Sequence, residues 1–225
     1  MTLESIDIET GTDPGASIIV LHGLGADGND FVPICDELEL DSVGPVRFVL
    51  PHAPMRRVTI NAGYVMRAWY DILGTDLVRI EDEPGLRASQ QEVQALIARE
   101  NARGVPSQRI VLAGFSQGCA MTLLTGVRHD ERLAGLAALS GYLPLATTTA
   151  AERSAANRDV PIFQAHGLHD PMIPVQRGRA SRDALQALGY PVEWHEYPME
   201  HSLCLEEVAD LNAWLLRVLA RQDVG

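Results

Sequence analysis

The stretch Arg109-Ile-Val-Leu-Ala-Gly-Phe-Ser116-Gln-Gly118 decides the fold. Residues 109–113 are mostly apolar or β-branched and predict a buried strand, and the residues after Gly118 are typical of a helix. A Gly-x-Ser-x-Gly pattern between a strand and a helix predicts a sharp, strained turn that holds the serine hydroxyl above the edge of a sheet. An ordinary tight turn also matches the pattern, so the strand and the helix are what make Ser116 a candidate nucleophile.

Short β-branched runs and amphipathic stretches alternate along the whole chain. That alternation is typical of βαβ units and predicts an α/β fold with a mostly parallel central sheet flanked by helices. The chain has no repeat and no Gly/Ser linker, and its 225 residues predict one domain, 1–225. The predicted strands are 17–22, 46–50, 109–113, 133–139, 160–165 and 192–197, and the predicted helices are 29–38, 85–103, 117–128, 176–188 and 202–220.

Two connections between the predicted elements differ in length. Residues 51–83 form one long irregular stretch, which contains Pro51-His-Ala-Pro54 and Trp69-Tyr-Asp71. Long segments of this kind in a compact domain are usually functional or disordered, and the apolar content here favours an ordered segment. The connection from Leu139 to Val160 is too short for a helical lid, so we expect no lid domain and an open, shallow substrate groove.

A serine hydroxyl is a poor nucleophile, so Ser116 requires a base within hydrogen-bond reach and an acid that orients the base. In this strand-turn-helix context the three groups follow in the chain order serine, acid, histidine. Asp170 lies just beyond the predicted strand 160–165, where sites in open parallel sheets collect. His201 lies in the loop after the predicted strand 192–197. Order and position together predict a triad of Ser116, Asp170 and His201.

Other assignments of the acid and the base stay open at this point. An aspartate in a turn is also favoured for its own local hydrogen bonds, and a histidine before a helix is often a surface residue. His195 lies within a predicted strand and His129 at a helix end, so neither has the freedom of a loop residue. His166 and His169 precede Asp170 too closely to be its partner in the usual geometry.

Two backbone N–H groups are predicted to stabilise the negatively charged oxygen of a tetrahedral intermediate. The residue after the nucleophile supplies one and the loop after an early strand supplies the other, which here are Gln117 and Leu24. The loop 22–28 is rich in glycine, so its backbone can approach a substrate closely. A phosphate-binding loop is the alternative, but no Lys-Ser/Thr pair follows and the glycine spacing differs from a dinucleotide fingerprint.

The net charge of −12 at pH 7 disfavours nucleic acid and stable membrane association, because both need clusters of basic residues. Cys35, Cys119 and Cys204 lie far apart, which predicts reduced thiols and no zinc site. The first ten residues are acidic, and no apolar run is long enough for a membrane helix, so we expect a cytoplasmic protein. The sequence leaves a homodimer open.

Several sequence blocks follow one another in a specific order: residues 21–31, Pro51-His-Ala-Pro54, Trp69-Tyr-Asp71, Gly114-Phe-Ser-Gln-Gly118 and Tyr197-Pro-Met-Glu-His-Ser202. With these blocks the chain resembles the phospholipase/carboxylesterase family, small lidless α/β-hydrolases that include the acyl-protein thioesterases. The resemblance spans nearly the whole chain and implies the α/β-hydrolase fold. It also implies the triad above, Leu24 and Gln117 as oxyanion donors, and the Trp69 region as part of the acyl pocket.

Two positions depart from the pattern of that family, which usually has glycine where this chain has Cys119 and Glu200. We expect Cys119 to pack as a small apolar residue in the helix after the nucleophile. Glu200 restricts the backbone of the loop that carries His201, and its carboxylate favours the protonated form of the neighbouring imidazole. These departures bear on efficiency and pH optimum rather than on the class of reaction.

These residues predict hydrolysis of carboxylic esters through an acyl-enzyme that forms on Ser116. Serine acyl transfer needs only proton transfer and oxyanion stabilisation, so we expect no cofactor and no metal ion. Trp69, Ile72 and Leu73 are the predicted apolar contacts for the acyl chain, and we expect a small-molecule ester with a short or medium chain. An acyl-protein thioesterase or a lysophospholipase would use the same triad, and both alternatives stay open.

Two further hypotheses belong to other classes of protein. A metal-dependent hydrolase would use His166, His169 and Asp170, but His-x-x-His without a glutamate partner on a helix is a poor zinc signature. A noncatalytic binding module on the same fold is the other, since fold does not imply function. Loss of activity in EDTA would favour the first, and failure of a fluorophosphonate probe to label Ser116 would favour the second.

Overall fold

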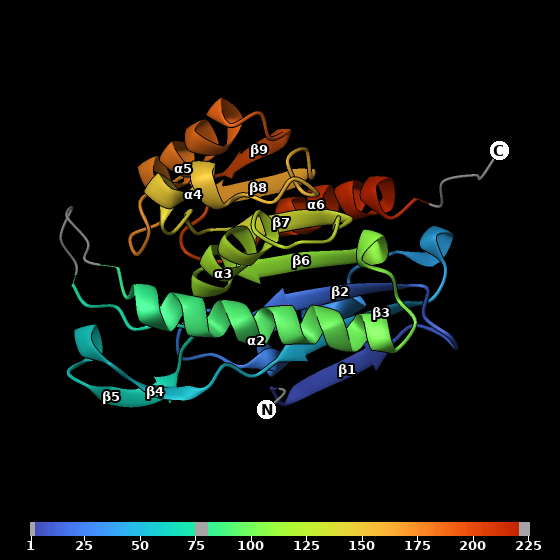
Figure 1. The fold of residues 1–225 in the computed structure, drawn as a ribbon, viewed down its shortest axis with the longest axis horizontal. Helices are drawn as coiled ribbons and strands as arrows, with labels where there is room; N and C mark the ends of the chain where they lie inside the picture. Colours follow the sequence, from blue (N-terminus) through green and yellow to red (C-terminus); the bar gives the residue numbers. More distant parts are fainter. Residues whose placement is uncertain (1–2, 75–80, 221–225) are drawn as a thin grey trace.

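One mostly parallel sheet runs through the middle of the molecule (Figure 1). The computed structural model describes residues 3–74 and 81–220, and within these ranges seven strands form the sheet in the order β1-β3-β2-β6-β7-β8-β9. β1 pairs antiparallel with β3 at one edge, and the other neighbouring pairs are parallel. The strands are β1 (Ser5–Glu9), β2 (Ala16–Leu21), β3 (Val46–Pro51), β6 (Ile110–Phe115), β7 (Gly135–Leu139), β8 (Ile162–Gly167) and β9 (Val192–Tyr197).

Helices cover both faces of the sheet (Figure 1). α2, α3 and α5 pack on one face through one cluster of buried side chains, whereas α1 and α6 pack on the other face through a second cluster. α4 lies in the connection between β7 and β8. The helices are α1 (Val32–Asp36), α2 (Glu83–Ala102), α3 (Gln117–Gly126), α4 (Ala146–Glu152), α5 (Val175–Ala187) and α6 (Leu205–Val218).

The apolar side chains of each central strand divide between the two clusters. On β2, Ile19 and Leu21 pack with α2 and α3, while Ile18 and Val20 pack with α1 and α6. All four side chains are buried. Successive side chains of a strand point to opposite faces, so a strand covered on both faces is apolar at every position. Full burial of each such side chain stabilises the fold by about 1.5–3 kcal/mol.

The predicted strands and helices are present, with ends that shift by a few residues, but one helix prediction is wrong. The segment predicted as a helix over 29–38 is a 3₁₀ turn, Gly28–Phe31, followed by the short α1. Pro33 lies in the first turn of α1, where its missing N–H is tolerated. The same missing N–H removes the hydrogen bond to residue 29 that one continuous helix would need.

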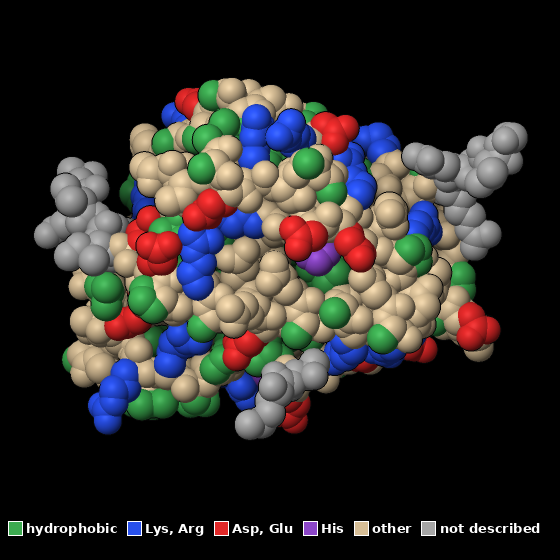
Figure 2. Space-filling view, in the orientation of Figure 1, with side chains coloured by type: hydrophobic (Ala, Val, Ile, Leu, Met, Phe, Trp, Pro, Cys, Tyr) green, Lys and Arg blue, Asp and Glu red, His purple; other side chains and the backbone are tan. Residues whose placement is uncertain are grey.

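Three elements lie outside the sequence predictions: β1, α4 and a hairpin of β4 (Met55–Val58) and β5 (Tyr64–Arg67). The hairpin lies within the stretch 51–83, whose residues 75–80 are outside the described ranges. Its turn has a positive φ at both Ala62 and Gly63, and the alanine at such a position hides the usual turn signal. Hydrophobic and basic side chains gather over this hairpin at the lower left of Figure 2.

A buried ion pair fastens the antiparallel edge of the sheet to α2. The carboxylate of Glu100, which has no exposed surface, accepts hydrogen bonds from Arg47 Nη1 at 2.8 Å and from Ser17 Oγ at 2.7 Å. The Arg47 side chain is itself nearly buried and reaches Glu9 of β1 at 2.8 Å. Removing one partner of such a pair leaves an uncompensated charge in the interior.

We therefore expect Glu100→Ala to lower the free energy of unfolding by about 3–5 kcal/mol, because Arg47 stays nearly buried, loses its buried partner and keeps only the exposed Glu9. Chemical denaturation measures the change. Arg217→Ala, which breaks the exposed pair with Glu193, is the control and should change stability by about 0–1 kcal/mol. A loss below about 1 kcal/mol for Glu100→Ala would show that the pair contributes no more than a surface contact.

Candidate active site

The candidate nucleophile lies in a strained turn between β6 and α3. Ser116 has φ 58° and ψ −115°, a backbone conformation that non-glycine residues rarely adopt, and its N–H donates to Leu139 O at 3.0 Å. The helix behind it approaches β2 very closely, since a Cβ on Gly118 would lie 1.9 Å from Leu21 O. A Cβ on Gly114 would lie 2.3 Å from the Gly118 carbonyl carbon. Both glycines of the pattern are therefore required by space.

The candidate acid is held by the turn that follows β8. Asp170 is buried, and its Oδ1 accepts the backbone N–H groups of Met172 and Ile173, each at 2.8 Å. Its other oxygen, Oδ2, accepts a hydrogen bond from His201 Nδ1 at 2.6 Å. An aspartate in a turn can be merely a local cap. Here one carboxylate oxygen serves the turn and the other serves the histidine, so both roles coexist.

The candidate base stands between this acid and the cleft. His201 lies in the loop after β9, and its ring packs against Phe115 with centroids 4.7 Å apart. The hydrogen bond to Asp170 commits Nδ1, which leaves Nε2 as the nitrogen that can accept a proton. Ser116 and His201 line the same cleft, whose volume is about 450 Å³. The structure thus brings together the three residues of the predicted triad.

The two predicted oxyanion donors come from the loop after β2 and from the start of α3. Leu24 follows β2 and lines the cleft, and Gln117 is the first residue of α3. Within residues 3–74 and 81–220, neither backbone N–H donates to another group of the protein. The Leu24 loop is fixed by a hydrogen bond from Gly25 N–H to Arg67 O at 2.9 Å. Both N–H groups are therefore available to a substrate oxygen.

A neutral histidine, His22, holds the loop that carries Leu24 through hydrogen bonds. His22 is fully buried, and its Nε2 accepts the N–H of Ala53 at 3.0 Å. Its Nδ1 therefore carries the proton and donates to Gly23 O at 2.7 Å. Burial lowers the pKa of His22 and disfavours its charged form. Its two hydrogen bonds therefore join the loop that carries Leu24 to the segment before the hairpin.

Trp69, predicted as an acyl contact, lies inside the protein. It has no exposed surface, and its indole N–H donates to His22 O at 2.8 Å. Its backbone N–H donates to the side chain of Gln117 at 3.0 Å, and the Gln117 amide in turn donates to Tyr70 O at 3.0 Å. The described residues that line the cleft do not include Trp69. This placement favours a positioning role for Trp69 over direct contact with substrate.

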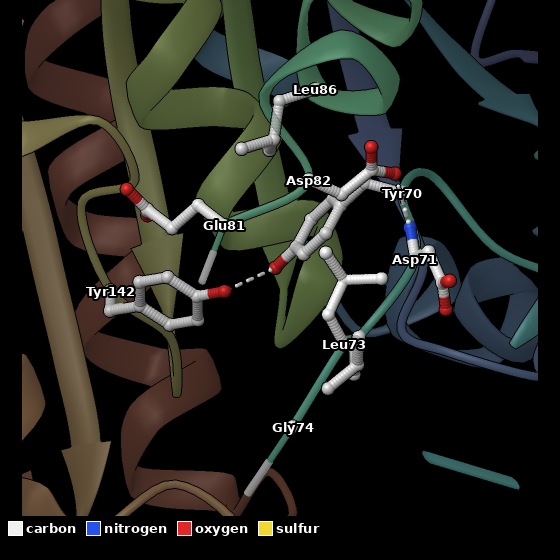
Figure 3. Close-up of a pocket in the computed structure, with 9 residues that line it drawn as sticks. Tyr70, Asp71, Leu73, Gly74, Glu81, Asp82, Leu86 and Tyr142 are labelled. Atoms are coloured by element: carbon white, nitrogen blue, oxygen red, sulfur yellow. Dashed lines mark hydrogen bonds between the residues drawn. The ribbon is translucent and has the colours of Figure 1, made fainter. Parts of the chain in front are cut away.

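The other two predicted acyl contacts also lie away from the cleft. Ile72 and Leu73 line a separate pocket of about 10 Å³. Figure 3 shows Leu73 beside the buried hydrogen bond that joins Tyr70 to Tyr142, whose hydroxyl oxygens are 2.8 Å apart. Substrate contact by Ile72 and Leu73 stays a prediction, and the structure places them in this neighbouring pocket.

Side chains from a strand and from two loops form the apolar lining of the cleft, and the sequence predictions missed most of them. Met66 comes from β5 of the hairpin, Met172 from the turn that holds Asp170, and Leu203 from the loop after His201. No periodic pattern links these positions, because they lie on three short segments that are far apart in the sequence. The cleft is lined by Gly23, Leu24, Ala26, Asp30, Phe31, Asn61, Met66, Phe115, Ser116, Met172, His201, Ser202 and Leu203.

The two unusual residues of the sequence occupy different environments. Cys119 is fully buried, and burial raises the pKa of its thiol, so it packs as an apolar group. Its sulfur lies close to Gly141, where a Cβ would approach within 2.5 Å. Glu200 is exposed, and its backbone carbonyl covers Gly167 at the end of β8. Neither side chain displaces a member of the triad.

Comparison with known proteins agrees with this geometry. Residues 4–219 match the family described as Phospholipase/Carboxylesterase. The chain belongs to that family. It is 41% identical over 232 residues to acyl-protein thioesterase 1 of Mycosarcoma maydis, an alignment that covers 96% of this chain and 97% of the relative.

Solved structures of the family show the same fold. The crystal structure of Arabidopsis thaliana SOBER1 matches with a TM-score of 0.86 and 29% identity over 91% of this chain and 99% of that one. Acyl-protein thioesterase 2 of Zea mays matches with a TM-score of 0.84 and 26% identity over 96% of this chain and 100% of that one. The predicted family and the predicted α/β-hydrolase fold, with its mostly parallel central sheet, are confirmed.

Family membership makes the chain a serine hydrolase of the carboxylic ester class, as the sequence predicted. In the described parts of the chain, no helix is both long and apolar enough to cross a membrane. Within the same ranges, no three His, Cys, Asp or Glu side chains are grouped so that they could hold a metal ion. His166 and Asp170 of the metal hypothesis do lie close together, and their contact is explained below.

We expect Trp69→Phe to lower kcat roughly tenfold while KM for a short ester changes little, because the lost indole N–H no longer holds His22 O beside the oxyanion loop. Trp214→Phe is the matched control, since Trp214 is nearly as buried but belongs to α6 and packs in the cluster on the other face of the sheet. Steady-state kinetics separate the two roles. An unchanged kcat with a raised KM for longer acyl chains would instead support direct substrate contact by Trp69.

Proposed function

We propose that the protein is a serine carboxylesterase that hydrolyses carboxylic esters through an acyl-enzyme on Ser116. The observation that carries the proposal is the 2.6 Å hydrogen bond between Asp170 and His201 at a cleft that Ser116 also lines. A buried acid that fixes the histidine tautomer beside a strained nucleophile is the arrangement that activates a serine hydroxyl. No cofactor is needed for this chemistry.

Acylation uses each group once. Ser116 Oγ attacks the carbonyl carbon of the ester while His201 Nε2 takes the hydroxyl proton. The carbonyl oxygen becomes an oxyanion, which the N–H groups of Leu24 and Gln117 stabilise. When the intermediate collapses, the bond to the leaving alkoxide breaks and Nε2 returns its proton to that oxygen, which releases the alcohol.

Deacylation repeats the steps with water as the nucleophile. His201 takes a proton from water, the hydroxide adds to the acyl carbon, and collapse of the second intermediate returns the proton to Ser116 Oγ. Asp170 stays ionised throughout and stabilises the imidazolium that forms in each half-reaction. Its burial strengthens this attraction, since charges interact more strongly where water is excluded.

The size and lining of the cleft support esters of short to medium acyl chains. Its volume of about 450 Å³ suits a small substrate. Met66, Met172 and Leu203 offer apolar surface, and each methylene they bury contributes about 0.8 kcal/mol. The acidic chain, with its net charge of −12, supports an enzyme that acts on small molecules rather than on nucleic acid.

Thioester hydrolysis is the second candidate, and the comparisons favour it. The relatives that align over most of this chain at about 40% identity carry the name acyl-protein thioesterase 1. A thioester presents the same carbonyl oxygen to Leu24 and Gln117, and its thiolate departs more easily than an alkoxide. The two activities therefore differ in the leaving group, which lies outside the acyl part of the cleft.

We expect Ser116→Ala to abolish ester hydrolysis, since loss of a triad nucleophile costs up to about 10⁶ in kcat. Asp170→Asn should lower kcat by roughly 10⁴, because an amide sets the wrong histidine tautomer. Circular dichroism checks that each variant is folded, and Ser154→Ala, a serine outside the cleft, is the matched control. Activity above a few per cent in pure Ser116→Ala, or labelling of that variant by a fluorophosphonate, would remove Ser116 as nucleophile.

We expect p-nitrophenyl butyrate to be hydrolysed with a higher kcat/KM than the palmitate ester, because the cleft is finite and longer chains leave it. Acyl thioesters of the same chain lengths, assayed in parallel, measure the preference for the leaving group. A steady rise in kcat/KM through palmitate, measured below micelle-forming concentrations, would contradict the short-chain proposal. A large preference for thioesters at every length would favour the second candidate.

A further inference from the structure

A second histidine contacts the triad acid from inside the protein. His166, the penultimate residue of β8, has no exposed surface. Its Nε2 lies 2.7 Å from Ile173 O and 3.5 Å from Asp170 Oδ2. A carbonyl oxygen only accepts, so Nε2 carries the proton and donates to Ile173 O. The mechanism above does not use this residue.

The other ring nitrogen of His166 is enclosed. Nδ1 has no hydrogen-bond partner within residues 3–74 and 81–220. A Cβ on Gly178 of α5 would lie 2.5 Å from it, so the helix backbone packs directly against the ring. Trp194 of β9 stacks on the ring, with centroids 6.4 Å apart. These contacts hold the imidazole in one orientation.

We propose that His166 is a positioning residue that aims the Asp170 carboxylate at His201. This inference rests on the proposed triad. Asp170 Oδ1 binds two N–H groups of the turn 170–173, and His166 binds the carbonyl at the end of the same turn. His166, a residue of β8, therefore holds the end of this turn at Ile173. The second oxygen, Oδ2, is left pointing toward His201.

The neutrality of His166 is part of this role. The charged groups that face it are Asp170, His201 and Glu196. Burial lowers the pKa of His166, so the ring stays uncharged. An imidazolium at this place would compete with His201 for the carboxylate and weaken its stabilisation of the catalytic imidazolium. A neutral N–H donor orients the turn without cancelling the charge of Asp170.

Three variants separate positioning from simple packing. His166→Phe fills the same space but removes the donor, whereas His166→Gln places an amide N–H near the position of Nε2. Gln164→Leu is the matched control, because Gln164 is buried on the same strand and binds Gly178 O at 2.9 Å but makes no hydrogen bond to the turn 170–173. Each variant is assayed for kcat and KM at a series of pH values on both sides of neutrality.

We expect His166→Phe to lower kcat about ten- to a hundredfold with KM within about twofold of the parent, because the base is misaligned while substrate binding is intact. The acid limb of its kcat/KM profile should move to lower pH, since an imidazolium without an aligned carboxylate loses its proton more easily. His166→Gln should keep kcat within about threefold and retain the parent profile. Gln164→Leu should leave kcat and the profile unchanged.

Parent-like kcat and acid limb in His166→Phe would overturn the proposal. So would equal losses in His166→Phe, His166→Gln and Gln164→Leu, which would show a purely structural effect. If His166→Phe does not fold, Gly178→Ala displaces the ring from the other side and should shift kcat and the acid limb in the same directions. Full activity of Asp170→Asn would instead remove the triad itself, so the two failures are distinguishable.

Discussion

The close approach of α3 to the end of β2 is the constraint on which the rest of the site depends. It exists because Gly118 has no side chain, since a Cβ there would lie 1.9 Å from Leu21 O. The approach favours the tight turn in which Ser116 has its strained backbone and Gln117 begins α3. The candidate nucleophile and the start of α3 are therefore set by one backbone contact, whereas the loop that carries Leu24 is held by contacts of its own.

The long segment after β3 supports this contact from the side. Ala53 N–H binds His22, Arg67 O binds Gly25, and the Trp69 indole binds His22 O, so the oxyanion loop is fastened to the segment at several points. Gln117 is joined to the same segment, because its side chain forms hydrogen bonds with the backbone of Trp69 and Tyr70. A segment that looks like an insertion into a βαβ pattern thus holds the loop that carries Leu24, a candidate oxyanion donor.

The candidate triad could be proposed from the sequence because this fold brings residues from separate parts of the chain to one edge of the sheet. Parallel strands end at one edge of the sheet, so residues just beyond β6, β8 and β9 meet although they are far apart in sequence. The lining of the cleft could not be predicted in this way. Met66 lies on a short strand of a hairpin that the sequence predictions missed, and Met172 lies on a turn. Trp69 is a large aromatic residue of the kind that often contacts substrate, but it faces the interior. The type of a residue indicates whether its side chain is buried, but it does not indicate whether the protein interior or a substrate covers it.

Burial keeps two of the histidines near the site uncharged, so the charge of the site lies on the pair of His201 and Asp170. His22 and His166 each donate a ring N–H to a backbone carbonyl, and burial lowers the pKa of both, so they shape loops as neutral groups. His201 alone of these three lines the cleft and shares a hydrogen bond with a buried carboxylate. In the proposed mechanism His201 is therefore the group that accepts the proton in each half-reaction, and the positive charge forms beside Asp170. Two histidines that stay neutral are thus what allow the third to change charge without repulsion from its neighbours.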